Sequence, residues 1–487
     1  MQSKSFRKEI TFLHALLPVL FLLTLIIYGL LVRPLFLDKE ALALETIFIL
    51  ASFFSISELF YIGFSWAEIQ ASVVRKVSTA LPAFFILFAI GVIISSWIVS
   101  GTIPMLVYYG LELVNPHYLY LLSFLIPIVF SLLTGTSWGS VGTIGVVLIG
   151  IATALEANLG ITAGAIIGGA YFGDKMSPLS DTTNLAALAT DVELFDHIRS
   201  MMVTTIPSAI IASIGFAILG FTHSPLILTA DLTSLDPFLE SLRAMFTFNL
   251  LLLIPPGIVL VGSLWKKPTI PILLTSVFSA CLLAILFQRY SLGDISSVLV
   301  NGFDASMASW VTDLPGQTVE LVNRGGLYSM KEAIFIAFLV FFFIGSIDRI
   351  NAMPTVVDRV FQLAKHRSTT ILSALGATAM TNAMTSNQYA TSFIIGDAFK
   401  SRFDNMRIPR KVLSRSIEDT GTMIESIIPW HATAIFMVAT LGVPWTDYWH
   451  WQFMSLVNLV VAPTVAILGI GCFYREDGLE ESNEVIN

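Results

Sequence analysis

Long apolar runs dominate the chain and recur along almost its whole length. Each run has roughly 20 residues, which is the length of a helix that crosses the hydrocarbon core of a bilayer. The pattern therefore predicts an all-α polytopic membrane protein. The main runs lie at residues 13–32, 44–64, 81–99, 203–221, 248–264 and 270–287.

Composition leads to the same class. Of the 487 residues, 55% are hydrophobic and 12% are charged, whereas a soluble protein has about 25% charged residues. A water-soluble surface cannot be built from that composition. The formal net charge is −8 and no nucleic-acid footprint is visible. The two cysteines, Cys281 and Cys472, belong to separate apolar segments, so a disulfide framework is not expected.

The placement of Lys and Arg gives the expected orientation. The first apolar run follows Lys4, Arg7 and Lys8, but it is too long for a signal peptide and no cleavage site follows, so we expect it to be the first membrane helix. With the N-terminus in the cytoplasm, 19 of the 26 Lys and Arg residues fall on the cytoplasmic side, in agreement with the positive-inside rule. We expect a multi-pass protein of a bacterial inner membrane with both termini cytoplasmic.

Two stretches, residues 118–155 and 370–396, must enter and leave the membrane on the same side for this orientation to hold. Each has a polar centre rich in Gly, Ser, Thr and Asn, namely TGTSWGSVGT (134–143) and MTNAMTSNQYATSF (380–393). We therefore predict two re-entrant hairpins with polar tips.

The two halves of the chain repeat the same order of parts. Residues 100–115 and 350–365 match in pattern, with Pro104 against Pro354. Each half then gives a hairpin, a broken helix and a further helix, and the copies enter from opposite sides. Such an inverted repeat is typical of an alternating-access carrier with its site near the midplane; accidental self-similarity of a helical bundle is the alternative. The predicted units are 1–76 (N-terminal transmembrane helices), 77–225 (first repeat, with hairpin 118–155 and broken helix 161–190), 226–330 (scaffold helices and linker), 331–472 (second repeat, with hairpin 370–396 and broken helix 417–441) and 473–487 (cytoplasmic tail).

The first predicted break is GDKMSPLSDTTN (173–184), which follows an apolar helix. Irregular backbone at this depth must be buried in protein or line a wet cavity, and its carbonyls, hydroxyls and carboxylates are hard oxygen ligands that suit sodium. Ionisable residues there are costly and are expected to be functional. The candidate ion-binding or substrate-binding residues of this break are Asp174, Lys175, Ser177, Ser180, Asp181, Thr182 and Asn184.

Lys175 is open to two interpretations. Its ammonium, or a proton, neutralises an aspartate when sodium is absent and is displaced by sodium, so that proton and sodium compete for one site. Alternatively, Asp174 and Lys175 form a structural ion pair near the interface.

The second predicted break is EDTGTMIESIIPW (418–430), where Asp419, Thr420 and Glu425 are candidates. Glu425 is flanked by Ile424 and by apolar residues that follow it, so desolvation should favour its protonated form. Glu418 either belongs to the site or pairs with Arg415 of the basic loop.

The hairpin tips supply neutral oxygens from Thr136, Ser137, Asn382, Ser386 and Asn387. For each of them, helix capping and turn chemistry are the alternative role. We expect Asp174, Asp181 and Asn387 to bind Na+.

Two further patterns have simpler explanations. Residues 135–139 satisfy G-x-S-x-G, but that motif needs a strand-turn-helix setting, so a serine hydrolase with His431 as base is only a remote alternative. Asp348 and Arg349 are expected to form a local ion pair at the end of a helix.

Three strings, GTSWGSVGTIGVVLIG (135–150), GDKMSPLSDTTNLA (173–186) and EDTGTMIESIIPW (418–430), together resemble the NhaC family of sodium/proton antiporters. The likeness covers nearly the whole chain. It implies the ion-transporter superfamily fold, with inverted repeats, two re-entrant hairpins, two discontinuous helices and an elevator-like homodimer. It implies Na+ and H+ as the transported ions, and no cofactor.

The resemblance does not identify the transported solute, because such a family looks to include malate/lactate exchangers and sodium-coupled amino-acid carriers. An organic-acid carrier should hold a cation for the carboxylate, and only Lys175 is available inside these segments. That favours Na+/H+ exchange, although half-helix N-termini can bind a carboxylate without a basic side chain. A sodium-coupled or exchange carrier of a small organic acid or amino acid is the alternative, and an enzyme is a distant third.

Overall fold

The computed structural model describes residues 8–226, 235–360 and 366–473, and all regular elements in these ranges are helices. Eight of the helices are long and apolar enough to cross a membrane, or up to ten if each of two bent helix pairs is one span. The predicted all-α polytopic class is therefore confirmed. Lys4, Arg7, Lys365 and the predicted cytoplasmic tail from residue 474 onward lie outside the described residues.

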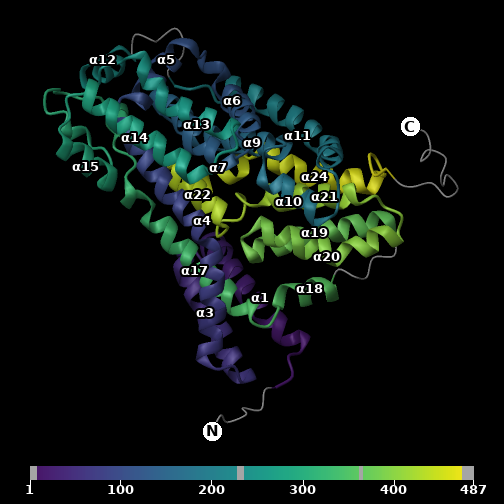
Figure 1. Ribbon diagram of the computed structural model, residues 1–487. Coiled ribbons are helices and arrows are strands. Elements are labelled where there is room, and N and C mark those ends of the chain that lie inside the picture. Colours follow the sequence, from purple (N-terminus) through teal and green to yellow (C-terminus); the bar gives the residue numbers. More distant parts are fainter. Residues whose placement is uncertain (1–7, 227–234, 361–365, 474–487) are drawn as a thin grey trace.

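One group of helices, called the scaffold group, is built around a single long helix. This helix, α4, runs for 34 residues from a capping box between Ser65 and Glu68. Figure 1 shows α4, α17 and α3 as a column that reaches toward the N-terminus. The scaffold group consists of α1 (Phe12–Ile26), α3 (Leu44–Ile62), α4 (Trp66–Val99), α13 (Ile254–Leu264), α14 (Thr269–Phe287), α15 (Leu292–Asn301) and α17 (Lys331–Asp348).

A second group, called the site group, packs around α9. Gly169 and Gly173 let the backbone of α9 touch that of α6, because a Cβ at either position would collide with Phe124 or Ile128 carbonyl oxygens. Small residues at such contacts are typical of membrane helix packing. The site group consists of α6 (Leu119–Thr134), α9 (Leu159–Met176), α10 (Asp181–Ala189), α11 (Leu194–Thr222), α19 (Arg367–Thr385), α20 (Gln388–Asn405), α21 (Arg410–Ile424) and α24 (Phe453–Leu468).

The chain changes direction at both predicted tips. The first tip, Gly135 and Thr136, separates α6 from α7 (Ser137–Ser140), which continues through a π-helical turn into α8 (Val146–Ala154). The second tip, Ser386 and Asn387, separates α19 from α20. Gly135 and Ser386 both have positive φ, 69° and 49°. The re-entrant course of these hairpins and the two-fold relation of the halves stay predictions.

Both predicted helix breaks are present. The first break, residues 177–180, separates α9 from α10, and the second break, residues 425–431, separates α21 from α22 (Ala432–Leu441). The short predicted arms correspond to α5 (Thr102–Leu113) and α18 (Ala352–Val360). The main difference in length is α4, which begins at Trp66 rather than at residue 81 and runs continuously through the predicted boundary between residues 76 and 77. Helix α20 continues to Asn405 rather than ending near residue 396.

Two expectations need correction. The run 248–264 is helical only from Leu250, as a 3₁₀ turn (Leu250–Leu253) continued by α13, and it is not by itself one of the eight membrane-length helices. It passes as a span only together with α12 (Asp236–Met245), from which it is bent by 94°. Asp348 and Arg349 do not pair locally. They reach α4 instead, where Arg349 lies 3.2 Å from Glu68 and Asp348 lies 3.7 Å from Arg75.

Candidate functional site

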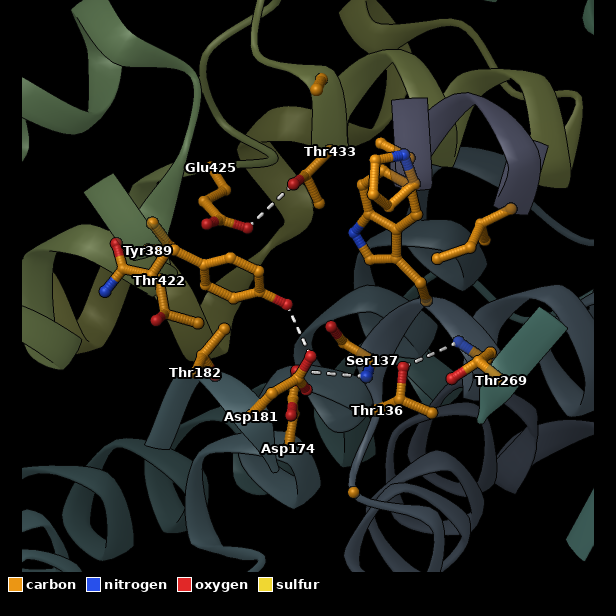
Figure 2. A pocket seen from close by; sticks show the side chains of 18 of the residues that line it. Thr136, Ser137, Asp174, Asp181, Thr182, Thr269, Tyr389, Thr422, Glu425 and Thr433 are labelled. Carbon is orange, nitrogen blue, oxygen red and sulfur yellow. Dashed lines mark hydrogen bonds between the residues drawn. The ribbon is translucent and has the colours of Figure 1, made fainter. Parts of the chain in front are cut away.

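A cavity of about 620 Å³ lies between the scaffold group and the site group. Residues of both tips and both breaks line it on one side, as Figure 2 shows for Thr136, Asp181 and Glu425. Helices α4 and α17 and the connection between α13 and α14 form the opposite wall. The polar lining residues are Thr79, Thr134, Thr136, Ser137, Asp174, Asp181, Thr182, Asn184, Ser263, Lys266, Lys267, Thr269, Ser386, Asn387, Gln388, Tyr389, Thr422, Glu425, His431 and Thr433.

Asp174 accepts a hydrogen bond from the helix that starts at the first tip. The backbone N–H of Ser137 donates to Asp174 Oδ2 at 3.1 Å, and Thr136 Oγ1 caps the same helix start by accepting from the Gly139 N–H at 3.2 Å. Asp174 is 5% exposed, and its Oδ1 has no hydrogen-bond partner within 3.5 Å among the described residues, although the Ser180 side chain interacts with the same carboxyl. A buried carboxylate thus presents one unpartnered acceptor beside the cavity.

Asp181 begins α10 on the far side of the first break. Ser180 is its N-cap and accepts from the Thr183 N–H, while the Asn184 amide donates to Ser180 O at 2.6 Å and closes the loop. The Tyr389 hydroxyl of α20 donates to Asp181 Oδ2 at 2.5 Å. The sequence prediction missed Tyr389, although an aromatic hydroxyl two residues after a tip was a signal for it.

Glu425 lies at the second break and is also buried, at 8% exposure. Thr433 donates to its Oε2 at 2.8 Å, and the Asn382 amide lies 3.5 Å from its Oε1. The second tip supports this break, because Ser386 Oγ accepts from the Ala432 N–H at 2.7 Å. The recorded hydrogen-bond donors of this carboxyl are therefore neutral groups.

Lys175 lies outside the cavity lining and pairs with Asp419, 2.5 Å away. Consecutive helix residues point about 100° apart, so Asp174 turns to the cavity while Lys175 turns into the site group. The Lys175 and Asp419 side chains are 0% and 2% exposed, and Thr204 donates to the same carboxylate oxygen. The alternative interpretation, a structural ion pair between Asp174 and Lys175, is therefore wrong, because Lys175 pairs with Asp419.

Several other candidates hold the backbone of the site group together. Ser177 donates to Leu132 O at 2.8 Å, and Thr420 donates to Leu375 O at 2.8 Å. Asn387 caps α20. Thr182 lines the cavity and shares a hydrogen bond with Ser180. The structure therefore brings Thr136, Ser137, Asp174, Asp181, Thr182, Asn184, Ser386, Asn387 and Glu425 to the cavity, and leaves Lys175, Ser177, Ser180, Asn382, Asp419 and Thr420 behind it.

The contacts of Glu418 and His431 differ from the alternative roles predicted for them. Glu418 accepts from Thr422 at 2.6 Å, while Arg415 lies 3.8 Å from Asp419 and donates to a backbone carbonyl. His431 is buried; its Nδ1 accepts from the Thr433 N–H. Glu418 therefore does not pair with Arg415, and the recorded contacts of His431 do not connect it to Ser137 in a catalytic triad.

The cavity offers carboxylate, hydroxyl and amide oxygens but no thiolate, and no group of three or more His, Cys, Asp or Glu in the described ranges could hold a metal ion. Such an oxygen set suits a hard cation. A membrane-spanning helical fold with two broken helices meeting at a buried polar cavity defines a polytopic secondary transporter.

Comparison with known proteins gives the family. Residues 169–470 match the model of the Na+/H+ antiporter family. A protein of Haemophilus influenzae, named an uncharacterized Na+/H+ antiporter, is 37% identical over 88% of this chain and 91% of its own. The Na+/H+ antiporter NhaC of Alkalihalophilus pseudofirmus is 33% identical over 84% of this chain and 87% of its own. The malate-2H+/Na+-lactate antiporter of Bacillus subtilis is 30% identical over 87% and 89%. The chain belongs to the NhaC family of Na+/H+ antiporters, as the resemblance predicted.

Proposed function

We propose that this protein exchanges Na+ for H+ by alternating access and that Asp174 and Asp181 bind the sodium ion. The observation that carries the proposal is the unpartnered Asp174 Oδ1 beside the cavity. Asp181 interacts with Asp174 electrostatically and lines the same cavity (Figure 2). A small hard cation between these carboxylates satisfies an acceptor that is costly to leave empty.

Competition between the two ions follows from the same pair. Two neighbouring carboxylates repel each other when both are charged, and either a proton or a sodium ion relieves this repulsion. Each ion therefore displaces the other. Glu425, whose recorded donors are neutral, is a second place where a proton can be carried.

We expect the cavity to open toward the cytoplasm. The exposed Lys266 and Lys267 line it from the connection between α13 and α14, and the positive-inside rule assigns that connection to the cytoplasmic side. Alternating access then needs the site group to move against the scaffold group, in the manner of an elevator. We further propose a homodimer in a bacterial inner membrane, with both termini cytoplasmic, no cofactor and no enzymatic activity.

Proton flux in proteoliposomes with a trapped pH dye tests this function. Sodium, lithium, potassium and malate are added separately to wild type and to Asp181→Asn. Sodium alone should move protons in the wild type and not in the variant. A flux that starts only when an organic solute is added would contradict Na+/H+ exchange.

A second function has one specific observation in its favour. Lys266 and Lys267 provide the cations that an organic-acid carrier needs, and the cavity volume lies within the range of small-molecule sites. The relative from Bacillus subtilis is named for malate and lactate. In an exchange carrier of such acids, Lys266→Gln with Lys267→Gln should raise KM for the acid, whereas in a Na+/H+ exchanger these changes should not raise KM for sodium.

A further inference from the structure

The hydrogen bond between Tyr389 and Asp181 joins the two halves of the chain at the cavity. Tyr389 is the second residue of α20, directly after the second tip, and Asp181 is the first residue of α10, directly after the first break. Asp174 and Glu425 differ in this respect, because their recorded donors belong to their own half of the chain.

Helix packing sets the position of the tyrosine. Helices α10 and α20 lie in direct contact, and Gly396 of α20 lies so close to Ala189 of α10 that a Cβ would collide with the Ala189 carbonyl oxygen. Asn387 caps α20 and fixes its first turn at the cavity. Figure 2 shows the Tyr389 ring between Glu425 and the Asp174 and Asp181 carboxylates.

This bond is accessible, unlike the ion pair between Lys175 and Asp419, which also joins the two halves. Tyr389 is 43% exposed and Asp181 is exposed, whereas the Lys175 and Asp419 side chains are 0% and 2% exposed. A cation that arrives through the cavity can therefore reach Asp181 without unpacking a helix. The phenol proton already occupies one acceptor position of that carboxylate.

We propose that Tyr389 is a positioning residue that competes with Na+ for Asp181 and so weakens sodium binding. The phenol stabilises the empty site with a charge-assisted hydrogen bond. Sodium that binds at the acceptor position used by the phenol must displace this hydrogen bond from Oδ2, and the hydroxyl returns when sodium leaves. The tyrosine thus keeps the affinity for Na+ low enough for the ion to be released. Every carrier must release its cargo after transport. This inference rests on the sodium site of the proposed function.

Equilibrium binding of isotopic Na+ to the purified full-length protein tests the inference. Tyr389→Phe removes one exposed oxygen and keeps the ring, so the fold should persist. Its dissociation constant for Na+ should fall about tenfold, because hydrogen bonds to charged groups contribute about that factor. The matched control is Tyr328→Phe, because Tyr328 is likewise exposed (58%) and lies outside the cavity lining; it should leave the constant unchanged.

A merely structural role would weaken binding or leave it unchanged, so either result for Tyr389→Phe overturns the inference. The double variant Asp181→Asn/Tyr389→Phe should bind sodium as weakly as Asp181→Asn alone; any further tightening would also contradict it. KM for sodium should fall with the dissociation constant, and the maximal rate should fall because release slows. Sodium-driven proton flux of the wild type tests the proposed function separately. If sodium binds but drives no flux, only that function fails.

Discussion

Lys175 Nζ lies 2.5 Å from Asp419 Oδ1, and this fully buried ion pair joins α9 of the first half to α21 of the second. Asp419 also accepts from Thr204 at 2.7 Å and lies 3.8 Å from Arg415. The two broken helices are therefore fixed to each other behind the cavity. The cavity carboxylates Asp174 and Asp181 are kept separate from this cluster.

Removing one partner of the pair should lower the free energy of unfolding more than removing both partners. Lys175→Met leaves a buried carboxylate without its closest cation, and such a loss lowers the free energy of unfolding by roughly 3–5 kcal/mol. The double variant Lys175→Met/Asp419→Asn should recover part of that loss, because no buried carboxylate then lacks its cation and Arg415 keeps its hydrogen bonds to two backbone carbonyls. Thermal unfolding in detergent measures both. Additive losses would show that the two residues are not coupled.

The cavity carboxylates should affect sodium rather than stability. A unit charge about 4 Å from a cation contributes about 1–4 kcal/mol between water and a protein surface, so Asp174→Asn should raise KM for sodium by roughly 5- to 1000-fold. Proteoliposome flux over a range of sodium concentrations measures KM. Asp313→Asn is the control, since Asp313 lies in a loop at φ 60°, a conformation that Asn also tolerates. Equal effects of the two variants would remove Asp174 from the site.

Glu425 should carry a proton without holding the fold together. In Glu425→Gln the amide oxygen can still accept from Thr433, so the melting temperature should stay close to that of the wild type. The side chain can no longer take up or release a proton, and we expect nearly all sodium-driven proton flux to be lost while isotopic sodium binding persists. Glu332→Gln, in the exposed first turn of α17, should change neither. Undiminished flux in Glu425→Gln would exclude this proton role.

The tips and breaks could be predicted because polar residues interrupt long apolar runs there. The lipid allows such interruptions only inside protein, so their positions in the sequence are informative. The side-chain partners could not be predicted in the same way. Lys175 pairs with a residue 244 positions away. In the sequence, the adjacent Asp174 is the nearest carboxylate and therefore the simplest partner to expect. Helix rotation decides between them, and an almost uniformly apolar helix contains little information about its rotation.

The same limit applies to the cavity wall. The positive-inside rule predicts only that Lys266 and Lys267 lie on the cytoplasmic side, and it does not predict that they line the cavity. Tyr389 was missed because its role depends on the packing of α20 against α10. Residues that approach a site from another helix group are set by tertiary packing, which single-sequence patterns do not contain.

The first tip should depend on one glycine. Gly135 has φ 69°, and a Cβ there would lie 2.6–2.9 Å from Leu179 atoms at the first break. Gly135→Ala should therefore shift the tip away from Asp174 and lower the free energy of unfolding by roughly 1–3 kcal/mol, with a matching loss of flux. Thermal unfolding and flux measure the two effects. Gly257→Ala is the control, because a Cβ at Gly257 meets nothing within 4 Å. A fully active Gly135→Ala would show that the tip tolerates the shift.

The carboxylates that line the cavity, Asp174, Asp181 and Glu425, all project from the site group. An electrical consequence follows if that group carries the cargo across the membrane. Each elementary charge moved through the whole membrane voltage changes the free energy by about 2.3 kcal/mol per 100 mV. The voltage then acts on the protein's own carboxylates as well as on the ion, and the number of bound cations decides which half of the cycle the voltage accelerates.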